Sequence, residues 1–449
     1  MQARKKQKFM DVTKYEVIVI GAGVAGLAAA RALAESGRRV VILEARDRIG
    51  GRIWTRSLAR ENGGPLAVEL GAEFIHGLPQ ETWSLVHAAN LGAYEIRGTS
   101  LSYANGQMHA GSEQYRGIEG VLEDMMKWMA RRPNGADVSF AEYLKLVGID
   151  GSTAQAAVNY VEGFNAADQN RISVAALVKQ QRAEEAIDTD RLFRLEGAYA
   201  DIPTYLAEQF VGARGELKLN VPVTKIIWRR GEVAVQFQNG GDMSELRARR
   251  ALITVPLGVL QSEAIEFDPR PSAVLNQANR LAMGEVMRLI LVFKERFWSE
   301  YSDLSFLFTP SERPSTWWTP MPHETPMLTA WAGGPKAAAL TRLVTPDGNA
   351  DALLDQTLGT LARVFNLSPA DLRDRLSSWH VHDWQRDPYS RGAYSYVPVG
   401  ALDAPAKMRD PVEDTLYFAG EHTDTAGHWG TVHAALATGI AAAQQLLGE

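Results

Sequence analysis

The 449-residue chain contains no cysteine, and this absence removes several classes of chemistry at once. Without thiols, a cysteine nucleophile, a cysteine-ligated zinc site, an iron–sulfur cluster and a flavin tethered through a cysteine are all excluded. A disulfide-stapled scaffold is excluded as well. The compartment is not decided by this absence, because a thiol-free chain suits an oxidising or a reducing environment.

The chain also lacks an excess of positive charge and any long apolar run. Its 47 Lys and Arg residues stand against 53 Asp and Glu residues, which gives a net charge of −6. Because nucleic-acid-binding domains usually carry a basic patch, no nucleic-acid partner is expected. The basic run at residues 4–8 has no apolar segment behind it and does not read as a signal peptide. With no stretch of about 18 apolar residues, no membrane anchor is expected, and we predict a cytoplasmic protein.

What the sequence does contain is 46% hydrophobic and 22% charged residues, as in ordinary globular proteins. At roughly 100–200 residues per domain, two or three structural units are expected. The chain opens with an apolar β-branched run at residues 16–20, an Ala- and Leu-rich segment at 23–36 that ends at Gly37, and a second apolar run at 39–43. This strand–helix–strand order predicts a parallel α/β sheet.

A glycine-rich motif joins the first strand to the helix. Residues 21–26 read Gly-Ala-Gly-Val-Ala-Gly, and Glu44 ends the next strand 18 residues after Gly26. Such a turn lets the backbone approach a pyrophosphate, places a helix N-terminus against its charge, and lets the acid accept a ribose hydroxyl. The acid also disfavours a 2′-phosphate. The motif therefore predicts a dinucleotide site that does not take an NADP-type ligand.

The rest of the chain changes character more than once. Residues 94–194 contain long amphipathic segments, such as 120–131 and 139–147, and are expected to be mostly helical. A meander of strands is expected next, closed by residues 250–256, and an Ala-rich helix is expected at 430–447. The strands are predicted at residues 217–223, 224–228, 233–237, 287–293, 327–332 and 415–418.

The second predicted strand runs into Glu44-Ala-Arg-Asp-Arg-Ile-Gly-Gly-Arg52, where two glycines and a guanidinium suit a second approach to phosphate. This run resembles the extended FAD fingerprint of the flavin amine oxidase family, which includes monoamine, polyamine and L-amino-acid oxidases. Further segments are similar to other parts of that family, namely residues 69–77, 251–260, 416–423 and 430–435. Together they span residues 15–445, so the resemblance covers nearly the whole chain.

The resemblance implies FAD as a non-covalent cofactor. It implies that Glu44 holds the adenosine ribose, Arg52 the pyrophosphate and Glu421 the ribityl–phosphate region. A helix N-terminus at residues 431–432 would meet the flavin, where its dipole stabilises the reduced anion. The predicted cofactor-binding residues are Gly21, Gly23, Ala25, Gly26, Glu44, Ala45, Arg46, Gly51, Arg52, Gly71, Ala72, Glu73, Val223 (through its backbone), Gly420, Glu421, Thr431 and Val432.

The fold implied by the resemblance is α/β. A Rossmann-type FAD-binding domain of the glutathione-reductase kind is expected with a mixed α+β substrate-binding domain that roofs the flavin. The FAD-binding domain is expected to be discontinuous, at residues 14–93, 195–285 and 398–449. The substrate-binding domain is expected at residues 94–194 and 286–397.

Amine oxidation needs an apolar slot more than acid–base machinery, because the cofactor takes a hydride from the carbon that bears a neutral amine. Residues 383–396 resemble the family stretch that brings an aromatic ring to the flavin, with Tyr394 as the match and Trp384 in the same run. His76 stands where polyamine oxidases carry a polar or acidic residue, and Thr431 stands where monoamine oxidases carry Tyr. Both favour the polyamine and spermine oxidases. We predict Tyr394, Trp384 and His76 as catalytic residues. We interpret Trp317-Trp318 as core, with the wall of the substrate-binding domain as the alternative.

Arg288 departs from the family and is the fourth predicted catalytic residue. The family usually has a Lys at this position, joined through water to the flavin N5. An Arg can donate to a water but does not lose its proton near neutral pH. If the Lys shuttles protons during reoxidation, Arg288 favours slow reaction with oxygen. Alternatively, Arg288 forms an ion pair at the boundary between the two domains and has a purely structural role.

The leading hypothesis is a flavin-containing amine oxidase that transfers a hydride from a primary or secondary amine, polyamine or monoamine, to FAD. Its products would be an imine, then an aldehyde, and hydrogen peroxide. The partners expected are the amine and oxygen, with the protein a monomer or homodimer. Alternatives are an L-amino-acid oxidase with Arg391 or Arg288 as carboxylate clamp, an amine dehydrogenase with poor oxygen reactivity, a desaturase-like or porphyrinogen-oxidising relative, and a non-catalytic flavin-bound scaffold. No metal site is expected, because the His residues lack a plausible set of partner ligands.

Overall fold

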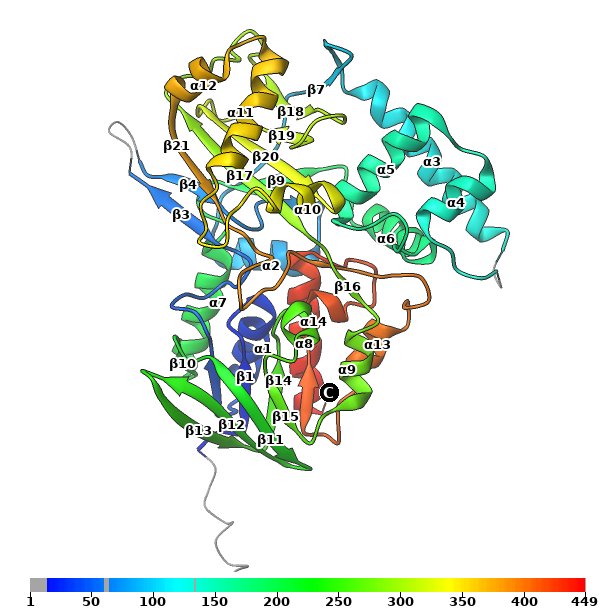
Figure 1. Ribbon diagram of the computed structural model, residues 1–449. Coiled ribbons are helices and arrows are strands. Elements are labelled where there is room, and N and C mark those ends of the chain that lie inside the picture. Colours follow the sequence, from blue (N-terminus) through cyan, green and yellow to red (C-terminus); the bar gives the residue numbers. More distant parts are fainter. Residues whose placement is uncertain (1–13, 60–63, 133–134, 449) are drawn as a thin grey trace, which may run out of the picture.

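The computed structural model describes residues 14–59, 64–132 and 135–448, and the basic run at residues 4–8 lies outside them. Figure 1 shows a parallel sheet with its helices in the lower half, a seven-stranded sheet at the upper left, and a group of four helices at the upper right. No helix in these described stretches is long and apolar enough to cross a membrane.

A five-stranded parallel sheet, in the order β10-β2-β1-β14-β23, forms the base of the molecule. Its strands are β1 (Val17–Ile20), β2 (Val40–Leu43), β10 (Glu216–Lys218), β14 (Arg250–Ile253) and β23 (Leu416–Phe418). The predicted strand–helix–strand opening and the parallel α/β sheet are confirmed. Segments far apart in the sequence therefore end at one common edge of this sheet, where ligands of open α/β sheets bind.

Each face of the parallel sheet is covered by a different layer. Val19 packs with helices α1 (Val24–Glu35), α7 (Asp201–Gly212) and α14 (Val432–Leu447), whereas Ile18 packs with a second, four-stranded sheet. Successive strand residues point to opposite faces, so both strand neighbours are buried. Helix α1 follows from its Ala- and Leu-rich sequence and stops before Gly37, whose φ of +79° an L residue rarely adopts.

The four-stranded sheet has the order β13-β12-β11-β15, with β11 (Val223–Arg229), β12 (Glu232–Asn239), β13 (Asp242–Ala248) and β15 (Glu266–Asp268). The prediction of a meander that starts at residue 217 and is closed by 250–256 was wrong at both ends. The first strand, β10, pairs with β2, and β14 is in the parallel sheet. Strand β13 went unpredicted because most of its side chains are exposed or half-buried, which leaves no apolar pattern.

The seven-stranded sheet has the order β21-β17-β20-β19-β18-β7-β8. The predicted strands at 287–293 and 327–332 are confirmed as β17 and β20. Helices α10 (Pro335–Thr341), α11 (Asp351–Phe365) and α12 (Pro369–Arg375) lie along this unit, and all three contribute buried apolar residues to its core. The strands are β7 (Thr99–Ala104), β8 (Gln107–Ala110), β17 (Val286–Phe293), β18 (Leu304–Phe308), β19 (Thr316–Trp318), β20 (Met327–Gly333) and β21 (Leu376–Val381).

The four-helix group consists of α3 (Ser112–Ala130), α4 (Phe140–Val147), α5 (Gly151–Asn165) and α6 (Val174–Ala186). The helical expectation for residues 94–194 holds for this part and fails before it, where the β7–β8 hairpin lies. The hairpin turns at Asn105-Gly106, both with positive φ. An Asn-Gly pair is the strongest local signal of a two-residue hairpin, so this turn was readable from the sequence.

Short elements connect these units. The small sheets are β3 (Thr55–Leu58) with β4 (Leu66–Glu69), β5 (Ile75–His76) with β9 (Leu192–Leu195) and β6 (Ala93–Glu95), and β16 (Ala282–Met283) with β22 (Ser395–Tyr396). The short helices are α2 (Gln80–Ala88), α8 (Leu257–Gln261), α9 (Ser272–Ala278), α13 (Ala404–Met408) and the 3₁₀ turn η1 (Glu421–Thr423). The domain limits drawn at residues 93/94 and 194/195 stay predictions, and both fall inside paired strands, β6 and β9.

Candidate active site

A cavity of about 1030 Å³ collects residues from every unit of the fold. It is lined by the glycine turn after β1, by the runs around Glu44 and Glu421, and by aromatic side chains from the seven-stranded sheet and α5. Every predicted cofactor-binding and catalytic residue lines it, apart from Gly26. Ligand pockets usually measure about 300–1,000 Å³, so this cavity has room for a dinucleotide and a second small molecule.

The glycine turn is shaped for close backbone approach. Gly21 has a φ of +106°, and a Cβ added at Gly26 would lie 2.1 Å from the Gly21 carbonyl oxygen, so both positions need glycine. A Cβ added at Gly23 would meet no atom within 4 Å, so this residue faces open space. Gly23 is the N-cap of α1 and has no side-chain cap, and the first turn carries no acid. The helix N-terminus is therefore ready to receive an anion.

Glu44 lies at the end of β2 and is buried, with 4% of its surface exposed. Its carboxylate accepts hydrogen bonds from the backbone N–H groups of Ala22 (2.7 Å) and Arg46 (2.9 Å), which lock it beside the glycine turn. Thr254, which the sequence analysis missed, donates through Oγ1 to the Ile20 carbonyl oxygen. A Thr directly after an apolar strand was the available signal for it.

Arg46, predicted to bind the cofactor, is held by an acid of the 383–396 run. Its Nη2 lies 2.6 Å from Asp387 Oδ1 and 3.0 Å from Ser390 Oγ, and its guanidinium packs over the Tyr389 ring. Burial raises the pKa of Asp387, but hydrogen bonds from His382 and Arg46 outweigh this, so the pKa lies below its ordinary value. The ion pair fixes the 383–396 run against the dinucleotide side of the cavity.

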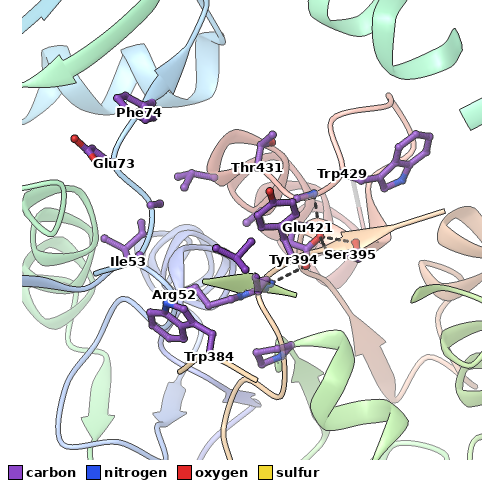
Figure 2. Close-up of a pocket in the computed structure, with 18 of the residues that line it drawn as sticks. Arg52, Ile53, Glu73, Phe74, Trp384, Tyr394, Ser395, Glu421, Trp429 and Thr431 are labelled. Atoms are coloured by element: carbon purple, nitrogen blue, oxygen red, sulfur yellow. Dashed lines mark hydrogen bonds and ion pairs between the residues drawn. The ribbon is translucent and has the colours of Figure 1, made fainter. Parts of the chain in front are cut away.

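Arg52 and Glu421 meet across the cavity wall, as Figure 2 shows. Arg52 Nη1 donates to Glu421 Oε1 at 2.8 Å and to the Ala393 carbonyl oxygen at 2.8 Å. The other oxygen of Glu421 accepts from Ser395 Oγ (2.6 Å) and from the backbone N–H of Gly430 (3.0 Å). Burial raises the pKa of Glu421, but Arg52 outweighs it and keeps the pKa below its ordinary value. One buried carboxylate thus ties together three distant segments.

Helix α14 points its N-terminus at the same cavity. Thr431 caps it by accepting from the Ala434 backbone N–H at 3.2 Å, and Thr431 and Val432 both line the cavity. Gly430 has a φ of +79°, and a Cβ there would lie 2.8 Å from the Tyr394 ring. The predicted approach of this helix end to the cavity is therefore present in the fold.

Tyr394 and Trp384, whose side chains Figure 2 shows, each donate a hydrogen bond to a backbone carbonyl. Tyr394 Oη donates to the Phe164 carbonyl oxygen at 2.8 Å, and burial raises the pKa of the phenol, so the ring stays neutral. Trp384 Nε1 donates to the Leu70 carbonyl oxygen at 2.9 Å. A Cβ on Gly71 would lie 3.3 Å from the Trp384 ring and 1.8 Å from the Arg52 carbonyl oxygen, so Gly71 allows this close packing.

His76 sits between aromatic rings instead of polar partners. Its ring lies edge-on to Phe74 (6.1 Å between centroids) and to Phe164 (6.0 Å). Burial lowers the pKa of His76 to about 4, so the imidazole is neutral at physiological pH.

Aromatic residues that the sequence analysis did not single out make up much of the wall. Trp317 and Trp318 are both buried, as interpreted, but Trp318 also lines the cavity. Successive residues on β19 face opposite sides of the sheet, so only one of the pair faces the cavity. The other wall residues are Tyr160 and Phe164, one turn apart on α5, Phe306 and Phe308, two apart on β18, and Trp331 and Trp429.

Arg288 and Glu73 form a buried cluster with Arg194, a residue that the sequence analysis missed. Glu73 accepts from Arg194 Nε (2.7 Å), from Trp318 Nε1 (3.0 Å) and from Arg288 Nη2. Arg288 Nη1 donates to the Gly71 carbonyl oxygen. Burial raises the pKa of Glu73, but the two arginines outweigh it and hold the pKa below its ordinary value. Glu73, predicted to bind the cofactor, therefore points its carboxylate at two guanidinium groups.

These residues fit FAD. The uncapped N-terminus of α1 faces open space at Gly23, and Gly51 packs against it, with an added Cβ only 3.6 Å from Gly23 Cα. Arg52 reaches the cavity with part of its guanidinium still exposed. A pyrophosphate between these groups would find backbone N–H donors and a positive charge, which is the chemistry that it needs.

Comparison with known proteins gives a consistent result. The family of flavin-containing amine oxidoreductases matches residues 24–447 of the chain. Polyamine oxidase 2 of Arabidopsis thaliana is 30% identical, over 97% of this chain and 88% of its own length. Polyamine oxidase 4 of Oryza sativa subsp. japonica is 29% identical, over 96% and 88%. The solved structure of a putrescine oxidase bound to putrescine aligns with a TM-score of 0.79 at 23% identity, over 97% of this chain and 99% of that chain.

The putrescine oxidase likeness establishes the fold, and the match over residues 24–447 establishes the family. The glycine turn, the buried Glu44 and the ion pair of Arg52 with Glu421 occupy one cavity in that fold. The chain belongs to the flavin-containing amine oxidoreductase family.

Proposed function

We propose that this protein oxidises small aliphatic amines that carry a second amino group, with the reacting amine held as the free base in the aromatic part of the cavity. The observation that carries the proposal is the makeup of that part, where the aromatic wall is joined by groups that are neutral near pH 7, such as Tyr394 and His76. FAD, when bound, accepts the hydride from the carbon beside the amine nitrogen.

The wall residues bind and orient the substrate and exclude water from it. The rings of Phe74, Trp318 and Phe306 contact one another, with Phe74 and Trp318 5.3 Å apart and edge-on. An alkyl chain between such faces loses water, and an ammonium would lose its hydration shell at high cost. The aromatic part therefore favours the uncharged amine, which is the form that can give up a hydride.

Acidic residues also line the cavity, with Glu184 beside Tyr160 and Phe164 of the aromatic wall, and they support a second amino group in the substrate. Glu184, Asp190 and Glu95 are all lining residues. Burial, with a smaller contribution from Asp190, raises the pKa of Glu184 to about 7, so a nearby ammonium would stabilise its ionised form. The polyamine oxidases and the putrescine oxidase named above are proteins whose names refer to amines of this kind.

The arginines of the described lining argue against an amino acid as substrate. Arg288 donates through Nη1 to Gly71 and through Nη2 to Glu73, and its remaining nitrogen, Nε, is buried, so no pair of its nitrogens is open to a carboxylate. Arg391 is exposed and donates to the Pro388 carbonyl oxygen. Arg46 and Arg52 are already paired with acids on the dinucleotide side.

An anaerobic titration of the purified protein tests the proposal, with the long-wavelength flavin absorbance as readout. The panel is putrescine, spermine, an N-acetylated polyamine, an aromatic monoamine and an L-amino acid. We expect one of the diamines or polyamines to bleach the flavin fastest. Bleaching by the amino acid alone would overturn the proposal. If no compound bleached the flavin, the hypothesis that the protein oxidises amines would be refuted.

A second candidate, an amine dehydrogenase, is favoured by Arg288, because an Arg fixed by Glu73 and Gly71 does not exchange protons as a Lys can. Admitting air to the reduced protein separates the two. Recovery of the flavin colour within seconds identifies an oxidase, and colour that returns only after an artificial electron acceptor is added identifies a dehydrogenase.

The oligomeric state and the compartment stay predictions, namely a monomer or homodimer in the cytoplasm. Light scattering of the eluting protein and fractionation of cells of the source organism measure them directly.

A further inference from the structure

The buried cluster of Arg194, Glu73 and Arg288 carries an unbalanced charge. The three side chains are 5%, 8% and 4% exposed, and two guanidinium groups share one carboxylate, so the cluster carries a net charge of +1. Two of its N–H groups, Arg194 Nη2 and Arg288 Nε, are buried and have no hydrogen-bond partner in the part of the chain that the structure describes. Buried charges are usually compensated fully, so the excess calls for an explanation.

The cluster is part of the aromatic wall: Glu73 and Arg288 line the cavity themselves, and Arg194 packs on Phe74, which also lines it. Arg288 packs over the Trp318 ring at 5.3 Å, and Arg194 packs over the Phe74 ring at 4.8 Å. Trp318 also donates to Glu73, so the indole joins the cluster to the cavity that it lines. A charge buried among aromatic rings acts on the cavity through a medium of low dielectric constant. It is therefore screened much less than it would be in water.

The other titratable groups offset this charge only in part near neutral pH. Of the acids that line the cavity, Glu95 is paired with Arg191, and burial raises the pKa of Glu184, which lies near Asp190, to about 7. Glu69 acts on Arg288 from β4, but burial raises the pKa of Glu69 to about 7, so it is half ionised at that pH and offsets the cluster fully only above it. Tyr94, beside Arg194, has a raised pKa and is neutral. The imidazoles of the lining are neutral as well, because burial lowers the pKa values of His76, His428 and His433, and Glu421 is paired with Arg52.

We infer that the Arg194–Glu73–Arg288 cluster is a fixed positive charge that makes the cavity take up its amine as the free base. An ammonium ion entering the aromatic part would meet a like charge that cannot move or lose its proton. The neutral amine meets no such repulsion. The proton therefore leaves the substrate on binding and goes to the solvent, and no residue of the wall has to act as a base. Glu73 is then a positioning residue that fixes both arginines.

This inference rests on the proposed function, because it needs an amine in the aromatic part of the cavity. It goes further in assigning a role to Arg288, Arg194 and Glu73 that requires no exchange of protons by position 288. It also explains why a second cation, Arg194, is brought to a carboxylate that one arginine could already neutralise.

Calorimetric counting of protons tests the inference on the FAD-loaded protein. The ligand is a primary amine on a carbon that carries no hydrogen, which binds as an amine but cannot be oxidised. The heat of binding in two buffers of different ionisation enthalpy gives the protons released per amine bound, and the measurement is repeated from pH 6 to pH 9. Release should rise from near zero to near one proton at a midpoint well below the pKa of about 10 of a free alkylamine.

Three variants test the role of the charge: two should move the midpoint in opposite directions and one should leave it unchanged. R288Q removes one charge but leaves the Arg194–Glu73 pair intact, and it should raise the midpoint by about one pH unit. R288K keeps the charge and should leave the midpoint where it is in the parent protein. E73Q adds one net positive charge and should lower the midpoint; if this variant does not fold, R288Q and R288K decide the question alone.

This experiment can refute the role of the cluster without refuting the proposed amine oxidation. If R288Q has the midpoint of the parent protein, desolvation by the wall accounts for the free base and the role of the cluster is refuted. If no protons are released at any pH, the amine binds as an ammonium and the inference is also refuted. Both results are compatible with flavin bleaching by amines, whereas a protein that binds and oxidises no amine overturns the proposed function itself.

Discussion

At Gly26 the absence of a side chain decides how closely α1 approaches β1. A Cβ on this residue would lie 2.1 Å from the Gly21 carbonyl oxygen and 2.7 Å from Thr254 Oγ1, and the first of these atoms belongs to backbone that cannot give way. G26A should therefore push the helix away from the strand, at a cost of about 1–3 kcal/mol, and displace the N–H groups at its N-terminus. Thermal unfolding and the flavin-to-protein absorbance ratio measure the two effects.

The matched control for G26A is G120A on α3. Gly120 is an exposed helical glycine, and a Cβ there meets no atom within 4 Å. Alanine should stabilise that helix slightly, by up to about 1 kcal/mol, and leave flavin content unchanged. Equal flavin content in both variants would show that close approach at Gly26 is not needed for the cofactor.

Glu69 should make stability depend on pH between about 4.5 and 7. Burial raises the pKa of Glu69 from 4.5 to about 7, although it accepts from Thr55 Oγ1 and the Tyr199 N–H. The folded protein therefore binds this proton more tightly than the unfolded chain. The resulting stability is fully present below pH 4.5 and is lost as the pH rises through about 7, a change of about 3 kcal/mol.

The variant E69Q should remove that part of the pH dependence and be more stable than the parent protein at pH 8. Chemical unfolding at several pH values measures it. E208Q, on the exposed face of α7, should leave the curve as it is in the parent protein. A parent protein whose stability rises steadily from pH 5 to pH 8 would contradict the assignment to Glu69.

The residues of the glycine turn were predictable because their constraint is local, whereas the cluster in the wall was not. Gly21 and Gly26 lie five positions apart and contact each other. The glycine motif therefore contains both partners of the contact. Arg194 meets Glu73 across 121 residues, and its partner becomes known only when β9 pairs with β5. A buried arginine has no marker in a single sequence, since most arginines are exposed.

At the scale of elements, the N-terminus of α14 offers a test that separates folding from cofactor binding. Thr431 caps the helix by accepting from the Ala434 N–H, and Ser139 caps α4 in the same way, by accepting from the Glu142 N–H at 3.2 Å. T431A and S139A should each cost about 1 kcal/mol of stability in the FAD-free protein. Only T431A should also weaken FAD binding, because Thr431 lines the cavity.

Fluorescence quenching of added FAD, together with thermal unfolding of the FAD-free protein, measures both quantities. T431S keeps the cap and should match the parent protein in both measurements. If S139A lowered FAD affinity as much as T431A, the loss would come from general destabilisation, and the role of the α14 N-terminus would be withdrawn.

Among the elements, those with an apolar period were predictable and those defined by their neighbours were not. Strand β17 reads Val-Met-Arg-Leu-Ile-Leu-Val-Phe and was found within one residue. Strand β10, Glu-Leu-Lys, contains a single apolar residue and pairs with the parallel edge of β2; the strand predicted at 217–223 overlaps it by two residues and runs on into β11. Strand β14 was found as a strand but placed in the wrong sheet, because periodicity does not say which partner a strand takes.

At the scale of the whole molecule, the cavity predicts a strong dependence of stability on FAD. The cofactor site draws on β1, β2, β22, η1 and the start of α14, so FAD binds only when these distant segments are together. Each tenfold rise in free FAD above the dissociation constant should add about 1.4 kcal/mol. The unfolding temperature should therefore keep rising with FAD concentration after the site is saturated.

The control ligand is FMN, which lacks the adenosine half that we predict the glycine turn and Glu44 to hold. FMN should raise the unfolding temperature much less than FAD at equal concentration. Acid precipitation should release all of the flavin into the supernatant, since no cysteine is present for a thioether link. Flavin retained in the pellet would contradict non-covalent binding, and equal shifts with FMN would contradict the dinucleotide site.

The packing of α1 against α14 limits how early in translation the FAD-binding part of the fold can be completed. Helix α1 ends at Glu35 and its neighbour begins at Val432, so 397 further residues must be synthesised before the two can meet. At about 5–20 residues per second, the ribosome takes roughly 20–80 s to deliver them. During that interval the apolar face of α1 lacks its native packing partner α14. Chaperones can bind such an exposed apolar face. The cavity predicted to hold FAD can be completed only after the start of α14 has been synthesised.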